Sequence, residues 1–165
     1  SWRARANLIM TPDEFEDLPA GSSLSGIIFV DGTPEDLQKN LDVRGILVIN
    51  GDFEVEPPAN LTIRNHPIGS GLLVKDDLEL ESNATIHGAI YAGHWLEIDT
   101  DHDHEDEPIT ITVTGGLVGF NVRVQPPSGS TITINYNRPA VSTPLDPEFN
   151  ASAPIVNINH WEEEY

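Results

Sequence analysis

Short runs of alternating apolar and polar residues recur along the chain, and the stretch from Gly71 to Gly88 shows the pattern most plainly. It contains three runs, at 72–74, 78–81 and 84–87, which are separated by short polar segments. Successive side chains of a β-strand point to opposite faces, so each run predicts a short strand with one buried face. Antiparallel hairpins would reverse at tight turns of the Asn-Gly kind. Here the same three-run pattern recurs instead.

The three-strand unit can be followed through most of the sequence. Opening strands start at Gly26, Gly45, Gly71, Ala89 and Gly116, which are 19, 26, 18 and 27 residues apart. Second strands lie at 53–55, 78–80, 96–98 and 122–124, and third strands at 61–63, 84–86, 109–113 and 132–134. A repeated three-strand coil with extra residues at its corners is typical of a solenoid. We therefore predict an all-β fold, a right-handed parallel β-helix (β-solenoid) of about five coils. A sandwich, which requires antiparallel pairing, is disfavoured.

The opening strands at 27–30, 46–49 and 72–74 are apolar on both faces, so the sheet that they form needs a cover on its outer side. We expect this cover to come from within the chain, because large apolar patches are rarely left open. A partner subunit is the alternative. Thr-Pro-acid-acid segments at 11–14 and 33–36 are typical helix starts. They predict short helices at 11–18 and 34–41, which are candidates for the cover, together with the tail after Pro139.

These patterns divide one domain into three parts. Residues 1–25 form an N-terminal segment with a short helix, and residues 26–136 form the β-helix. Residues 137–165 form a C-terminal strap with one last alternating strand at 155–158. The strap contains four prolines, Pro139, Pro144, Pro147 and Pro154. Because proline cannot donate a ladder hydrogen bond, this part is predicted to run extended along the surface.

The amino-acid composition, and above all the net charge, excludes some classes of binding partner. The 165 residues contain no cysteine, and 27 acidic residues against 8 basic ones give a formal net charge of −19. Such a charge repels phosphate backbones and anionic lipid heads, so we expect no nucleic-acid binding and no membrane contact by this domain. The acid-rich surface suits high salt or divalent cations, although a merely solvated surface explains it as well. The sequence has no run long and apolar enough to span a membrane and no signal-peptide core.

The acidic segment at 99–107 is the sharpest local feature. Asp99, Asp101, Asp103 and Glu105 alternate along it, and such spacing can surround a calcium ion with oxygen ligands. The segment departs from the helix-loop-helix calcium pattern, since His104 and Thr110 stand where glycine and glutamate belong. A calcium site of another geometry, a transition-metal site at His102 and His104, and a solvated corner loop all remain open. No other cofactor is expected.

A second acidic pattern lies on the second strands. Glu54, Glu79 and Glu97 occupy equivalent positions, with Arg123 at the next, so they are predicted to stack about 4.8 Å apart on the outside. Paired acids on the flank of a β-helix can cleave polysaccharide, which makes a glycan-acting enzyme a rival hypothesis. A solvated face is the simpler interpretation, and we expect no enzyme. Trp95 and Trp161 are expected to cap the core, with sugar stacking or partner contact as the alternative.

Taken together, these residues resemble the C-terminal β-helical domain of PilX-like minor pilins of type IV pilus systems. The resemblance covers about 25–163. It rests on the Gly-Ile-Ile-Phe-Val-Asp-Gly opening at 26–32, the coil at 71–88, Ala-Ile-Tyr-Ala at 89–92, the Ile-Asn-Tyr-Asn exit at 134–137 and the Ile-Asn-His-Trp-Glu ending at 158–162.

This resemblance implies a non-enzymatic structural or adhesive head domain of a pilus assembly or cell-surface protein. It implies an extracellular location, membrane anchoring of the full-length form if an apolar helix precedes the domain, and partners among other pilins, cell-surface proteins and surface glycans. The alternative is a polymerising scaffold of the bactofilin kind, whose β-helices stack end to end.

Overall fold

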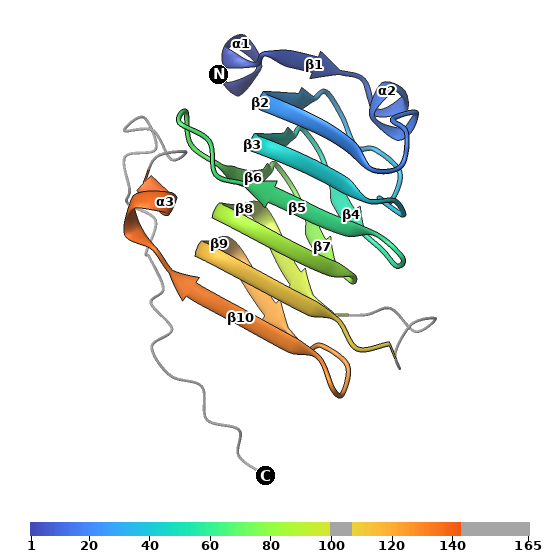
Figure 1. Ribbon diagram of the computed structural model, residues 1–165, viewed down its shortest axis with the longest axis vertical. Coiled ribbons are helices and arrows are strands. Elements are labelled where there is room, and N and C mark those ends of the chain that lie inside the picture. The colour runs from blue at the N-terminus through green and yellow to red at the C-terminus, as the bar shows by residue number, and fades with distance from the viewer. Residues whose placement is uncertain (100–106, 143–165) are drawn as a thin grey trace.

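A computed structural model describes residues 1–99 and 107–142, and it shows an all-β parallel solenoid of about six turns (Figure 1). The strands are β1 (Leu8–Met10), β2 (Ser22–Val30), β3 (Leu41–Ile49), β4 (Phe53–Val55), β5 (Asn60–Arg64), β6 (Gly71–Val74), β7 (Leu78–Leu80), β8 (Asn83–Ile98), β9 (Thr110–Val124) and β10 (Thr131–Tyr136). Three short helices accompany them, α1 (Trp2–Arg5), α2 (Pro12–Glu16) and α3 (Arg138–Ser142).

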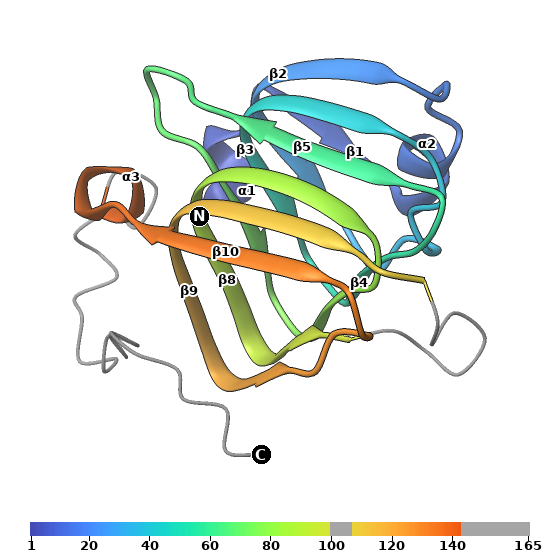
Figure 2. The same ribbon diagram turned by 60° about the horizontal axis from the view of Figure 1, so that its bottom comes forward.

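Each turn of the solenoid contributes to three faces, which the view along the turns displays (Figure 2). The first face holds 22–25, 41–44, β5, 83–87, 110–115 and β10. The second holds β1, 26–30, 45–49, β6, 89–92 and 116–119. The third holds β4, β7, 96–98 and 122–124. All of these pairings are parallel.

The strand positions confirm the predicted coil on all three faces. The five opening strands are the second face, the apolar-charged-apolar strands are the third, and the remaining strands are the first. The count of about six turns exceeds the predicted five. First-face strands at 22–25 and 41–44, together with β1, extend the sheet toward the N-terminus.

Glycines form the corner between the first and second faces. Gly26 and Gly45 pair in register with φ of 102° and 136°, a region that residues with a side chain rarely adopt. A Cβ atom on Gly45 would overlap the carbonyl oxygen of Gly26. The backbones of successive turns can therefore meet at this corner only without side chains.

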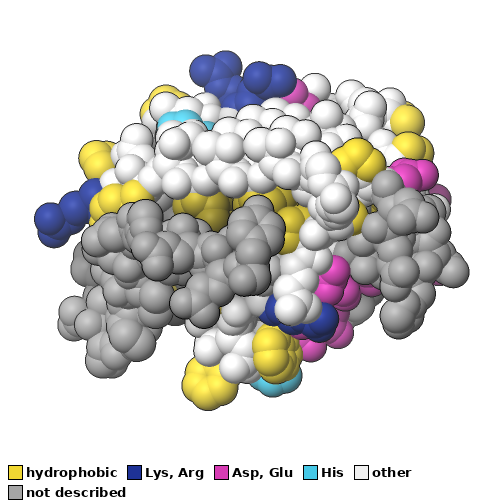
Figure 3. Space-filling view, turned by 90° about the horizontal axis from the view of Figure 1, so that it is seen from below, with side chains coloured by type: hydrophobic (Ala, Val, Ile, Leu, Met, Phe, Trp, Pro, Cys, Tyr) yellow, Lys and Arg dark blue, Asp and Glu magenta, His cyan; other side chains and the backbone are white. Residues whose placement is uncertain are grey.

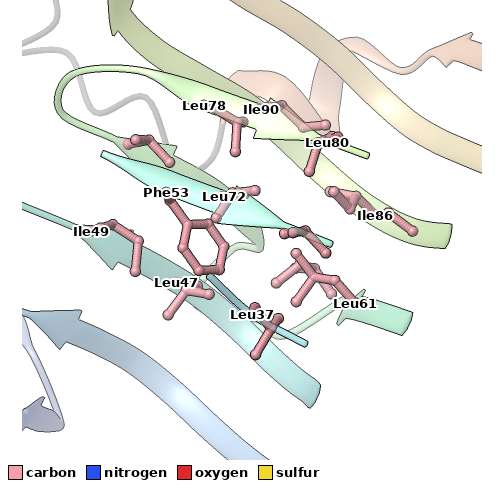
Figure 4. Close-up of a cluster of buried hydrophobic side chains, with 14 of the residues drawn as sticks. Leu37, Leu47, Ile49, Phe53, Leu61, Leu72, Leu78, Leu80, Ile86 and Ile90 are labelled. Carbon is pink, nitrogen blue, oxygen red and sulfur yellow. The ribbon is translucent and has the colours of Figure 1, made fainter. Parts of the chain in front are cut away.

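The inward side chains of the three faces make one continuous apolar core (Figure 4). Leu47, Leu61, Leu72, Leu80 and Ile90 are among its fully buried members. Phe15 of α2 belongs to the same core, and its ring meets that of Phe53 edge to face, with the centroids 6.0 Å apart. The helix start predicted at Thr11 is confirmed, and Thr11 and Glu14 form a capping box there. Helix α2 thus closes the N-terminal end of the core.

The outer side of the second face carries a separate apolar cluster, as its two-sided pattern predicted. Ile27, Phe29, Ile46, Val48 and Leu73 are buried there. The partly buried residues that pack against them are Trp2, Ala6 and Tyr91. Among the described residues the cover comes from within the chain, but not from the segments at 11–18 or 34–41. Most of the tail after Pro139, the third candidate, lies outside the described residues. The segment around α1 covers the cluster, because α2 uses its only buried residue to close the core.

Two further expectations were wrong. Residues 34–41 are not helical: Leu37 forms a parallel bridge with Val55, and Leu41 begins β3. Both leucines are buried, but they enter the core from two faces on either side of a corner. In the expected strap, residues 138–142 form α3 rather than an extended segment. The rest of the strap and the strand expected at 155–158 lie outside the described residues. None of the described helices is long and apolar enough to cross a membrane.

Candidate functional site

The outward side chains of the third face form two columns that run along the solenoid. Phe53 pairs with Leu78, and Leu78 pairs with Leu96 in the next turn. The residues that precede them in the sequence, Asp52, Asp77 and Trp95, therefore lie side by side in successive turns. Two residues further along, Glu54 pairs with Glu79. Parallel pairing without a shift repeats the same kind of side chain at each level. This stacking produces the site.

The first column is held by hydrogen bonds from one turn to the next. The backbone N–H of Asp52 donates to Thr33 Oγ1 at 3.0 Å. The N–H of Asp77 donates to Asp52 Oδ1 at 3.1 Å, and the N–H of Trp95 donates to Asp77 Oδ1 at 2.9 Å. Asp77 Oδ1 also lies 2.7 Å from His94 Nδ1. These contacts fix the backbone position of Trp95.

The second column is a row of carboxylates that ends in a cation. Glu54 pairs with Glu79, Glu79 with Glu97, and Glu97 with Arg123, as the sequence predicted. Arg123 lies 3.5 Å from Glu97 Oε1 and 3.3 Å from Asp99 Oδ2. The negative charge at this end of the column is therefore balanced by a neighbouring guanidinium.

At the other end of the column, carboxylates crowd around Glu54. Its oxygens lie within 4.8 Å of those of Asp36 and Glu56, and another such group joins Glu54 to Glu79 and Glu81. Burial, followed by the charges of Asp36, Glu79, Glu81 and Glu56, raises the pKa of Glu54 to about 8. Burial and Glu56 also raise the pKa of Asp36. Glu54 therefore holds a proton at neutral pH, which relieves the repulsion.

The two columns line an open groove of about 370 Å³. Its walls are Thr33, Pro34, Asp36, Asp52, Phe53, Glu54, Asp77, Leu78, Glu79, Trp95 and Glu97. Trp95 is 37% exposed, so the expectation that it caps the core was wrong. It precedes the inward Leu96 and therefore points outward, like Glu97. The groove combines one exposed aromatic ring, that of Trp95, with a row of hydrogen-bond acceptors.

Only one of the four predicted calcium ligands lies within the described residues. Asp99 is described, and its carboxylate contacts Arg123. Asp101, Asp103 and Glu105 lie outside the described residues, as do His102, His104 and Trp161. Asp99 is thus placed at the cationic end of the carboxylate column, away from the crowded group around Glu54.

Sequence reasoning found Glu54, Glu79 and Glu97 among the six groove carboxylates and missed Asp36, Asp52 and Asp77. It also missed Glu56 and Glu81, which crowd Glu54 from outside the groove lining. Asp36 was assigned to a helix, although its place before Leu37 matches that of Glu54 before Val55. Glu56 and Glu81 each follow the last apolar residue of a third-face strand, and that recurrence was the available signal.

Comparisons with protein-family models, curated proteins and solved structures find no match to this chain.

Proposed function

We propose that the chain is a non-enzymatic structural and adhesive head domain, displayed on a cell surface by a pilin-like assembly, and that its third-face groove binds surface glycans. The observation that carries the proposal is the groove itself. Exposed Trp95 lies beside the carboxylates of Asp77, Glu79 and Glu97. An aromatic ring stacks on the apolar face of a sugar, and carboxylates accept hydrogen bonds from sugar hydroxyls.

The acidic character of the groove favours neutral sugars. Adding an anionic sugar beside Asp77, Glu79 and Glu97 would place like charges together, which costs free energy at short range. Neutral glycans avoid that cost and retain the hydroxyl donors.

The solenoid supports a display role. The N-terminal end of its core is capped by α2, and the core continues through about six turns. A body held at its capped end would present the groove along its flank. The interaction partners would then be other pilins at the held end and glycans or cell-surface proteins along the flank.

The test is glycan binding by the whole chain. We expect isothermal titration with neutral oligosaccharides to show binding that Trp95→Ala weakens at least about fivefold, since stacking on one aromatic ring contributes about 1 kcal/mol or more. Tyr136→Ala is the matched control, because Tyr136 is an exposed aromatic residue on the first face. Absence of binding across neutral and acidic panels, or equal loss in both variants, would contradict the proposal.

A second candidate, glycan hydrolysis, is favoured by one observation. Glu54 keeps a proton near neutral pH and stands beside the carboxylate of Glu79. This is the arrangement of an acid that protonates a glycosidic oxygen while a second carboxylate assists attack on the sugar carbon. New reducing ends that disappear in both Glu54→Gln and Glu79→Gln would establish this activity. Binding without new reducing ends would leave the adhesive role.

End-to-end polymerisation, the bactofilin-like alternative, requires two open ends. At the N-terminal end, Phe15 of α2 packs on the end of the core, where a stacking neighbour would otherwise pack. A discrete monomer in light scattering would agree with the head-domain proposal, whereas mass growing with concentration would favour the polymer.

A further inference from the structure

Threonines form regular rows on the outer side of the first face. Four of them, from successive turns, pair in register and make up the threonine row: Thr62, Thr85, Thr112 and Thr133. Thr110 and Thr131 pair on one side of this row, and Thr114 and Asn135 pair on the other. The strands that carry them lie one below the next in Figure 1. The side chains therefore repeat about every 4.8 Å from turn to turn and about every 6.6 Å along a strand.

This surface has no acidic side chain, in a chain that contains 27 of them. The outward positions at 60–64, 83–87, 110–114 and 131–135, which we call the threonine grid, hold seven threonines, three asparagines, Arg64 and His87. Seen from the C-terminal end, the strip along β10 is mostly white, the colour of uncharged polar side chains and of the backbone (Figure 3). The next position of the threonine row toward the N-terminus is Asp42, whose carboxylate pairs with Arg64 at 2.8 Å. The grid therefore suits an uncharged ligand.

The threonine row presents its hydroxyl groups to solvent. Thr85 is exposed, and the other three threonines are half-buried between their neighbours. Helix α3 packs on the second face instead, where Val141 lies beside Gly116. No hydrogen bond joins the hydroxyls of the row to another residue within 1–99 or 107–142. Water therefore satisfies them. Because the χ1 angle of threonine is stiff, this water is held at repeating positions.

A surface that orders water in two directions is complementary to a ligand that repeats in the same way. Holding mobile water at a protein surface costs entropy. In ice the water is already immobilised, and its oxygen atoms form a hydrogen-bonded lattice with repeats of similar size. A sugar chain fits the grid less well, because a sugar ring stacks on an aromatic side chain and none of the grid positions is aromatic.

We propose that the threonine grid binds the surface of ice, with the hydroxyls of the threonine row bonded to water in register with the ice lattice. The grid lies on the first face and the groove on the third, so this proposal does not rest on glycan binding.

Thermal hysteresis of the whole chain, the gap between the melting and freezing temperatures of a single ice crystal, tests the proposal. We expect the unmodified chain to show hysteresis. Thr112→Tyr places a bulky ring in the threonine row and should lose it. Ile9→Tyr is the matched control, because Ile9 is an exposed strand residue on the outer side of the second face. It should keep the full hysteresis. Circular dichroism checks that both variants fold.

Absence of hysteresis in the unmodified chain overturns the proposal, and so does equal loss in the two variants. If Thr112→Tyr does not fold, Thr85→Lys replaces it, since Thr85 is exposed. Full hysteresis in a folded Thr85→Lys variant would also overturn the proposal.

Partition of the fluorescently labelled chain between growing ice and the remaining liquid gives a second measurement. We expect the unmodified chain and Ile9→Tyr to enter the ice and Thr112→Tyr to be excluded from it. Exclusion of the unmodified chain would contradict the proposal. Co-sedimentation with microcrystalline cellulose, without hysteresis and lost in Thr112→Tyr, would instead assign the grid to a solid polysaccharide.

Trp95→Ala separates this proposal from glycan binding at the third face. That variant should keep the full hysteresis while its affinity for glycans falls. Loss of hysteresis in Trp95→Ala would place the contact with ice on the third face and overturn the assignment to the threonine grid.

Discussion

Asp77 connects its own turn of the solenoid to Trp95 in the next turn, because Asp77 Oδ1 accepts the backbone N–H of Trp95 at 2.9 Å. The same oxygen lies 2.7 Å from His94 Nδ1. One carboxylate thus orients both aromatic residues at the end of the first column. The position of the Trp95 ring depends on a side chain one turn away.

Replacing Asp77 should therefore affect both stability and binding. We expect Asp77→Ala to lower the free energy of unfolding by about 1–2 kcal/mol, since the Trp95 N–H loses its acceptor. Glycan binding should weaken with it. Asp77→Asn keeps a carbonyl acceptor and is the control, expected to recover most of both losses. Urea denaturation and titration calorimetry measure the two effects, and equal losses in both variants would exclude the hydrogen bond as their cause.

The raised pKa of Glu54 predicts a pH dependence of stability. In the unfolded chain this glutamate has an ordinary pKa near 4.5, against about 8 in the fold. The folded state therefore holds the proton more tightly, and the stability associated with it is fully present below about pH 4.5 and is lost as pH rises through about 8.

Substituting Glu54 with glutamine should remove this pH dependence. We expect Glu54→Gln to be more stable than the unmodified chain at pH 9 and to lose less stability between pH 5 and 9. Thermal unfolding across that range measures the slope. Glu35→Gln is the control, as Glu35 is exposed and lies outside the groove lining. An unchanged slope in Glu54→Gln would show that Glu54 does not carry the proton.

The glycine corner predicts a steric cost. Gly45→Ala combines a positive φ with overlap against Gly26, so we expect a loss of more than about 3 kcal/mol of stability. Gly21→Ala isolates the backbone cost, because Gly21 also has a positive φ but nothing lies within 4 Å of an added Cβ. That variant should lose about 1 kcal/mol. Similar losses for both would mean that close approach of the turns contributes little.

The closed N-terminal end predicts a different effect. We expect Phe15→Ala to cost about 3–4 kcal/mol, because a buried ring that contacts Phe53 is removed from the core. Phe120→Ala is the control, as Phe120 is 82% exposed and its loss should change stability by less than about 0.5 kcal/mol. Denaturant titration compares them. A small loss in Phe15→Ala would indicate that α2 does not hold the end of the core.

The strands and the carboxylate column could be predicted because a solenoid repeats one local pattern. The alternation around Glu54, Glu79 and Glu97 sets both their outward direction and their stacking, once parallel pairing is assumed. Strand position and side-chain direction are local properties of such a chain.

The failures lie where local pattern is ambiguous. Leu37 and Leu41 are four residues apart, as on one side of a helix, yet the same spacing arises when two buried residues flank a corner. The cover by Trp2 was not predicted, since a helix of four residues is too short to show periodicity. The crowding around Glu54 was missed because it joins Asp36, Glu56 and Glu81, which depend on corner geometry rather than on alternation.

The unshifted register of the third face also bears on how such a groove can evolve. Each turn supplies one rung with its own acidic residue, and adjacent rungs are about 4.8 Å apart. Duplication of a whole turn would lengthen the groove by one rung and leave its width and chemistry unchanged. Insertion of an odd number of residues within a strand would reverse its inward and outward residues. The length of ligand that the groove accommodates is thus inherited in whole-turn increments.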